Sequence, residues 1–207
     1  TAIMVFMSGV FVVLLAGIRW RIVFAALFAG LLGSPAWYLF LAQAHQKNRI
    51  LTFLDPYRDP TGAGYNIIQS QIAIGSGGIY GKGYGNGAQS HLDFIPESHT
   101  DFILAVLAEE FGLLGVLFLI GLYLFVMLRG FAIAYAARDL FGRLLAGSIT
   151  LTFFLYVFIN MAMVSGLMPV IGLPLPLISR GGTSIVTMFI GFGLLMSIQT
   201  HDRQKFP

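Results

Sequence analysis

The polar segment Pro96–Asp101, directly before a long apolar stretch, contains three side chains that can accept or donate protons: Glu97, His99 and Asp101. Ionisable groups at the mouth of a membrane bundle are costly to desolvate and often mark a functional site. A carboxylate held there can act as a general base toward a hydroxyl group. The spacing also fits a structural role, because Ser98 and Asp101 match a capping box at a helix N-terminus. The two roles are compatible.

Two further carboxylates, Glu109 and Glu110, lie within the apolar stretch that follows Asp101. Eight residues separate Asp101 from Glu109, which places Glu109 near the same helix face and about 12 Å deeper. Ionised groups at such a depth need partners, and Arg49 or Arg180 could supply one. The sequence is equally consistent with a structural ion pair and with a place in the site.

Residues 75–87 contain seven glycines in thirteen positions, with Lys82 among them. Such a loop can bring backbone N–H groups close to a phosphate, with the lysine as a point charge. It matches neither common nucleotide-binding fingerprint, because no strand precedes it and no Lys-Ser/Thr pair opens a helix. A flexible turn is the competing interpretation.

Residues 169–183 combine three prolines and three glycines with mainly apolar side chains. Prolines and glycines exclude a regular helix, and irregular backbone at membrane depth persists only when it is buried in protein or lines a cavity. We therefore expect a re-entrant outer loop that packs against Asp101, with Arg180 pointing into the shared space. A plain tight turn is the alternative.

The histidines His45, His91 and His99 lack the spacing of metal ligands, and the chain has no cysteine. These residues therefore predict no histidine or thiolate metal site. A carboxylate-bound divalent cation, Mg²⁺ or Mn²⁺, stays open, but no pattern in the sequence specifies a cofactor.

The composition assigns the class of protein. The 207 residues are 57% hydrophobic and 10% charged, whereas soluble domains average roughly 25% charged residues. The net charge of +3 is small and dispersed, so nucleic acid is not an expected partner. Apolar stretches of roughly spanning length predict an all-α polytopic membrane protein, a single membrane domain over residues 1–207, with five transmembrane helices; these stretches are 2–18, 22–42, 102–128, 144–168 and 184–199.

Basic residues in the short connections predict the orientation, since such residues favour the cytoplasmic side. They lie between the first two spans, between the third and fourth, and after the fifth: Arg19 and Arg21; Arg129, Arg138 and Arg143; Arg203 and Lys205. The long loop 43–101 and the loop 169–183 then face outward. Because the chain opens inside an apolar segment without an initiator Met, we expect it to be a fragment of a longer protein.

Several motifs resemble the C-terminal half of the shape, elongation, division and sporulation family, and its RodA branch more closely than FtsW. They are residues 54–59, 62–70, 73–78, 81–83, 94–102, 105–112, 160–164 and 172–179. The resemblance covers essentially the whole chain and is most specific at Phe94–Phe102. It implies a ten-helix bundle of which about five N-terminal spans are missing here.

The resemblance implies a peptidoglycan glycosyltransferase that polymerises lipid II in the bacterial cytoplasmic (inner) membrane, with its active site facing the periplasm. Its implied partners are a class B penicillin-binding protein and the elongation machinery. Asp101 corresponds to the family's catalytic carboxylate, and Asp93 falls where relatives have an acidic residue. Arg180 replaces the usual Tyr and adds a cation near the expected site.

In the expected mechanism, Asp101 accepts the proton of the acceptor sugar's 4-hydroxyl as that oxygen attacks the donor's anomeric carbon. Undecaprenyl pyrophosphate leaves, and a cation meets its charge. The expected substrate-binding residues are Arg49, Lys82, Asp93, Glu97, His99, Glu109 and Arg180. Three other functions stay open: a lipid II transporter, a non-catalytic scaffold for a penicillin-binding protein, and another transferase or ligase that uses polyprenyl-linked sugars.

Overall fold

The computed structural model describes residues 43–58, 64–87 and 100–205, together with Gly9, Val10, Ala25 and Phe28. These four isolated residues are helical and fall within the predicted spans 2–18 and 22–42, which otherwise lie outside the described residues. The elements are α3 (Ala44–Leu54), the short 3₁₀ helix η1 (Pro56–Arg58), α4 (Tyr65–Gly77), α6 (Ile103–Ala136), α7 (Leu140–Val164) and α8 (Gly182–Lys205). The described part contains no strand, and the all-α prediction is confirmed.

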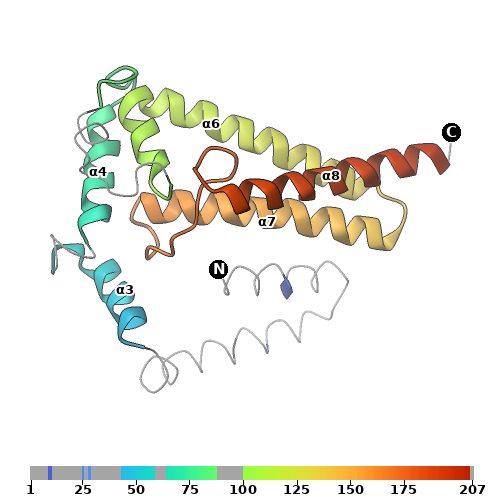
Figure 1. Ribbon diagram of the computed structural model, residues 1–207, viewed down its shortest axis with the longest axis horizontal. Coiled ribbons are helices and arrows are strands. Elements are labelled where there is room, and N and C mark those ends of the chain that lie inside the picture. The colour runs from blue at the N-terminus through green and yellow to red at the C-terminus, as the bar shows by residue number, and fades with distance from the viewer. Residues whose placement is uncertain are drawn as a thin grey trace.

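Within the described residues, three segments are long and apolar enough to cross a membrane: Ile103–Ala136, Leu140–Val164 and Gly182–Thr200. They confirm the three C-terminal predicted spans, although α6 continues to Ala136 rather than to residue 128 and α7 begins at Leu140 rather than at residue 144. The α6–α7 connection and the C-terminus lie at one end of these helices, and α3 and α4 lie at the other (Figure 1). The two described basic regions that were predicted for one side therefore share an end, and the connection with Arg19 and Arg21 lies outside the described residues.

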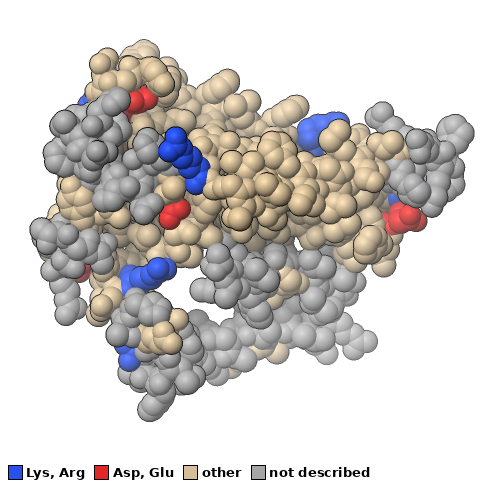
Figure 2. All heavy atoms as spheres, in the orientation of Figure 1, with Lys and Arg blue, Asp and Glu red and all other residues tan. Residues whose placement is uncertain are grey.

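Charged side chains also separate toward the ends of the molecule. On the face drawn in Figure 2, they lie near the α3–α4 end and toward the opposite end of the long helices, with an uncharged stretch between. This distribution suits helices whose middle turns contact lipid, because a charge at that depth is costly.

The long helices approach closely where residues are small. A Cβ atom at Gly130 of α6 would overlap the side chain of Thr150 of α7, and small residues permit such contacts between membrane helices. Phe153 of α7 meets Tyr123 and Phe192 edge-on, with ring centroids 5.7 and 5.5 Å apart. These aromatic contacts join α6, α7 and α8.

Helix α6 is broken at Gly112, where φ is 65° and ψ is −163°. The first segment, residues 103–111, lies beside α4, and the chain then turns sharply into the long rod (Figure 1). Residues 113–136 extend about 36 Å at 1.5 Å per residue, which suffices for a hydrocarbon core of ~30 Å. The break thus accommodates a helix that would otherwise be too long to fit the membrane without tilt or protrusion.

The carbonyl groups that end the first segment accept hydrogen bonds from the loop after α4, which we call the glycine loop (residues 78–83). Lys82 N donates to Glu109 O, and Gly83 N donates to Glu110 O, each at 3.0 Å. Carbonyls at a helix end lack intrahelical partners. The glycine loop supplies those partners.

The amides that begin the second segment are bonded by the same loop. Leu113 N donates to Gly78 O at 3.0 Å, and Leu114 N donates to Ile79 O at 3.2 Å. Both sides of the break are therefore satisfied by backbone atoms of one loop, as buried peptide groups require.

Two glycines make this close contact possible. Gly81 has φ +78°, and a Cβ there would overlap the Glu110 carbonyl. Gly112 has φ +65°, and a Cβ there would overlap Gly81 N and lie 2.6 Å from Ile79 O. Backbone meets backbone at this point, with no flexible side chain that could move aside.

An ion pair strengthens the same contact. Lys82 Nζ lies 2.8 Å from Glu109 Oε1; the Glu109 side chain is fully buried, and that of Lys82 is 34% exposed. Gly85 N donates to Glu110 Oε1 at 3.2 Å. The partner of Glu109 is thus Lys82 and not Arg49 or Arg180. The amides of Lys82, Gly83 and Gly85 bond to Glu109 and Glu110 of α6, so these N–H groups are already engaged within the protein.

We predict that Gly81→Ala destabilises the protein by about 1–3 kcal/mol, because it adds both a positive-φ strain and a backbone overlap. Gly78→Ala is the matched control, since Gly78 also has positive φ but nothing lies within 4 Å of its added Cβ. Thermal unfolding in detergent measures the difference. Equal losses in the two variants would contradict the close contact.

We also predict that Lys82→Met destabilises the protein by about 1–3 kcal/mol, because it leaves the buried Glu109 carboxylate without this cation. Lys82→Met combined with Glu109→Gln should recover most of that loss. Thermal unfolding in detergent of the single and the double variant measures this recovery. Equal losses in the two variants would contradict the stabilising role of the ion pair.

Candidate functional site

Asp101 lies just before α6, and its side chain is partly exposed. The helix begins at Ile103 with Phe102 as N-cap, and no side-chain hydrogen bond caps it among the described residues. The capping-box prediction placed Asp101 inside the first turn and is wrong in that respect, because the chain enters the helix later. Ser98, the other half of the expected box, lies outside the described residues.

Two side chains hold the backbone at Asp101. Asn160 of α7 donates from Nδ2 to Asp101 O at 2.8 Å and to Leu173 O at 2.6 Å. Ser179 Oγ donates to Thr100 O and accepts from Leu175 N at 2.7 Å. The segment that contains Asp101 is therefore joined to the loop between α7 and α8 at two successive residues.

The carboxylate of Asp101 lies against the same loop. A Cβ atom at Gly172 would lie 3.3 Å from Asp101 Oδ2, and Gly172 has φ +78°. A side chain at this position would both strain the backbone and crowd the carboxylate. Glycine leaves room beside Asp101.

The loop between α7 and α8 enters the protein interior. Leu173 and Leu175 are each 1% exposed, Pro176 is also buried, and Tyr123 Oη donates to Pro176 O at 2.7 Å. The prediction that residues 169–183 pack against Asp101 is confirmed, and a plain tight turn is excluded by this burial.

Arg49 of α3 is the predicted cation that the structure brings to this region. Its Nη1 lies 3.4 Å from the carbonyl oxygen of Ile171, the residue before Gly172. Arg49 is exposed. An exposed guanidinium beside the loop that lies against Asp101 is suited to bind a phosphate group.

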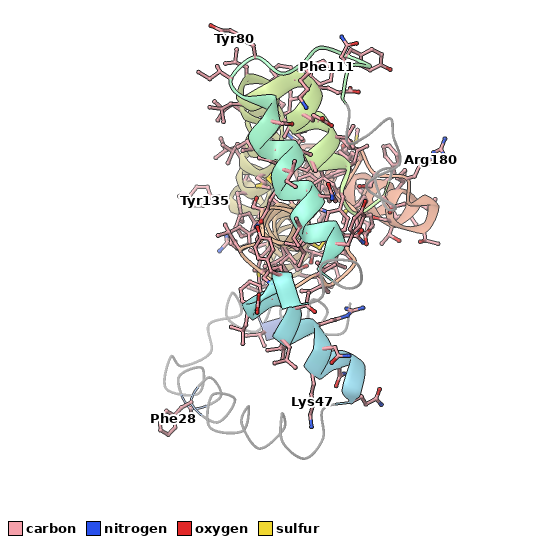
Figure 3. The ribbon with its side chains drawn as sticks, turned by 90° about the vertical axis from the view of Figure 1, so that its left-hand side faces the viewer. Phe28, Lys47, Tyr80, Phe111, Tyr135 and Arg180 are labelled. Carbon is pink, nitrogen blue, oxygen red and sulfur yellow. The ribbon has the colours of Figure 1, made fainter. Side chains whose placement is uncertain are left out.

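Arg180 is exposed and projects away from the helices in the view of Figure 3. The preceding residue, Ser179, is buried. That Arg180 points into the space shared with Asp101 stays a prediction. Lys82 is engaged by Glu109.

A groove of about 520 Å³ begins at the loop and continues between α7 and α8. Its walls are residues of 148–156 on α7, Gly172–Pro174 of the loop, and residues of 183–194 on α8. Three of its hydroxyl groups bond within their own helices: Ser148 to Leu145 O, Thr152 to Ser148 O, and Thr187 to Thr183 O. The groove therefore presents a mainly apolar lining to whatever enters it.

Three predicted site residues, Asp93, Glu97 and His99, lie outside the described residues. Within the described part, no three His, Asp or Glu side chains lie close enough together to bind a metal ion. The structure adds Asn160, Ser179 and Gly172 to the site. The sequence offered one signal for Asn160: an asparagine inside an apolar span predicts a buried amide, and a buried amide needs hydrogen-bond partners.

Comparisons with known proteins agree with this architecture. A family model described as "Cell cycle protein" (FtsW/RodA/SpoVE) matches residues 1–204. The chain is 51% identical over 203 residues to peptidoglycan glycosyltransferase MrdB of Escherichia coli (strain K12), covering 98% of this chain and 55% of that protein. It is 45% identical over 175 residues to a probable peptidoglycan glycosyltransferase FtsW of Geobacter sp. (strain M18), covering 84% of this chain and 47% of that one.

A solved structure gives the same result. It comes from work on "Structural coordination of polymerization and crosslinking by a peptidoglycan synthase complex", with a TM-score of 0.80 and 33% identity over 98% of this chain and 56% of the other. The chain spans about half the length of the curated relatives it matches. With a family model matched over nearly its whole length, the chain belongs to the FtsW/RodA/SpoVE family of cell cycle proteins.

Proposed function

We propose that this protein is a peptidoglycan glycosyltransferase that polymerises lipid II, with Asp101 as the general base. One observation supports this most directly: the Asp101 carboxylate lies against Gly172, which is also a wall of the apolar groove between α7 and α8. A proton acceptor at the end of an apolar groove suits a substrate that is part sugar and part lipid. The named activity of the relatives supports the same assignment.

The substrate would be divided between two environments. The polyprenyl chain of lipid II would lie along the apolar groove, where its burial is favourable, and its disaccharide and pyrophosphate would lie at the outer mouth beside Asp101. In this proposal the outward-facing side is the end that contains α3, α4 and the loop. The protein would lie in the bacterial inner membrane with its site facing the periplasm.

The reaction would proceed by one displacement. Asp101 accepts the proton of the acceptor's 4-hydroxyl while that oxygen bonds to the donor's anomeric carbon. The bond between that carbon and the pyrophosphate oxygen breaks, and undecaprenyl pyrophosphate departs with the electron pair. Inversion at the anomeric carbon follows from a single step.

Arg49 is the group that we assign to the leaving pyrophosphate, because it is exposed and bonds to the loop beside Gly172. A preorganised guanidinium stabilises charge that develops on a leaving oxygen. Mg²⁺ or Mn²⁺ could share this charge; the described residues group no three carboxylates or histidines, so no step is assigned to a metal.

The proposed partner is a class B penicillin-binding protein within the elongation machinery. The solved relative belongs to a complex that couples polymerisation to crosslinking. A glycan strand leaving the outer mouth would pass directly to a crosslinking enzyme held at that surface.

We predict that Asp101→Asn lowers lipid II polymerisation by about 100-fold or more, because it removes the proton acceptor but keeps the size of the side chain. Asp139→Asn is the control, since Asp139 is exposed and precedes α7 at the opposite end. The assay uses the protein at the length of its relatives, in detergent, so that glycan product excludes simple transport. Polymerisation at the wild-type rate by Asp101→Asn would refute the proposed mechanism.

We further predict that Arg49→Ala lowers the polymerisation rate by about 10- to 100-fold, because a donor to the leaving group is lost. Arg180→Ala, which removes an equal charge from a side chain that projects away, should have a smaller effect. Steady-state rates at saturating lipid II compare the two. The reverse order would assign the pyrophosphate to Arg180.

A further inference from the structure

Asn160 is a fully buried amide near the C-terminal end of the apolar helix α7, 0% exposed. Its Nδ2 donates to two backbone carbonyls on different segments, Asp101 O and Leu173 O. Both amide hydrogens are therefore used to join the residue proposed as general base to the loop that contains Gly172. Ser179 links the same two segments, since its Oγ donates to Thr100 O and accepts from Leu175 N.

The acceptor atom of the same side chain differs from Nδ2 in its hydrogen bonding. Asn160 Oδ1 is buried and has no hydrogen-bond partner among the described residues. An unbonded buried acceptor is destabilising. The buried Oδ1 therefore reduces what Asn160 contributes to stability. The two hydrogen bonds donated by Nδ2 are the interactions that its amide provides.

The position of these bonds restricts the Asp101 side chain. Fixing the carbonyl of Asp101 through Asn160 and that of Thr100 through Ser179 sets the backbone on both sides of the Asp101 Cα. The direction of the Cα–Cβ bond follows from that backbone. The carboxylate is then held beside Gly172, where its Oδ2 lies.

We infer that Asn160 is a positioning residue for Asp101, with Ser179 as its second support; this inference rests on the proposed function of Asp101. Asn160 contacts no reacting atom in this assignment. It aligns the carboxylate with the acceptor hydroxyl, and a misalignment of about 1 Å can lower a rate by about 100-fold.

A mutant comparison tests this role. Asn160→Ala should lower kcat by about tenfold or more and change the KM for lipid II by less than about twofold, as expected for lost alignment with retained binding. Ser70→Ala is the matched control: Ser70 is also 0% exposed, and its Oγ bonds to Val164 O at 3.0 Å, away from Asp101. It should lower the thermal midpoint but leave kcat and KM within about twofold. Equal kcat losses in the two variants would overturn the inference.

A double-mutant cycle separates this inference from the proposed function. In the Asp101→Asn background, adding Asn160→Ala should lower the rate by less than about twofold, because Asn160 acts through the missing carboxylate. If Asp101→Asn is impaired and Asn160→Ala still has its full effect, the inference is wrong and the general base stands. If Asp101→Asn is fully active, the proposed role of Asp101 as general base is refuted, and so is this inference.

A second variant covers the case in which Asn160→Ala does not fold. Ser179→Ala removes one hydroxyl that donates to Thr100 O, and it should show the same loss of kcat with an unchanged KM, again only when Asp101 is present. Suppose that Asn160→Ala does not fold and that Ser179→Ala folds with wild-type kcat. Both residues would then have structural roles only, and the inference would be overturned.

Discussion

Peptide groups within an apolar bundle must find hydrogen-bond partners inside the protein. In this chain the requirement applies at two breaks in regular helix, one within α6 and one between α7 and α8. Helix α6 opens at Gly112, and its exposed carbonyls and amides are bonded by the glycine loop. The chain between α7 and α8 is also irregular, and side chains of Tyr123, Asn160 and Ser179 bond to its backbone. Irregular backbone at both places thus has partners within the protein.

The two sets of hydrogen bonds hold opposite ends of one short segment. Residues 103–111 begin beside Asp101, which Asn160 holds, and end at Glu109 and Glu110, which the glycine loop holds. A segment bonded at both ends keeps its side chains in place better than a free loop end does. The ion pair of Lys82 with Glu109 lies toward the opposite end of this segment from Asp101.

Hydropathy was enough to predict the three described spans, because length and apolar content are properties of a single stretch of sequence. The Pro/Gly pattern likewise predicted an inserted loop beside Asp101. The ionic partner of Glu109 was not predictable in this way, since Lys82 lies 27 positions earlier and reaches it only through the turn after α4. The role of Asn160 was not predictable either, because it depends on which two backbone carbonyls lie next to α7.

The contact of Gly130 with Thr150 sets the closest packing of α6 against α7. At this point, away from the site, the backbone of α6 touches a side chain of α7, and toward the other end the two helices separate (Figure 1). About 27 Å of helix separates Gly112 from Gly130 at 1.5 Å per residue. A larger residue at position 130 would have to displace Thr150, and it would disturb the packing of α6 on α7 far from Asp101.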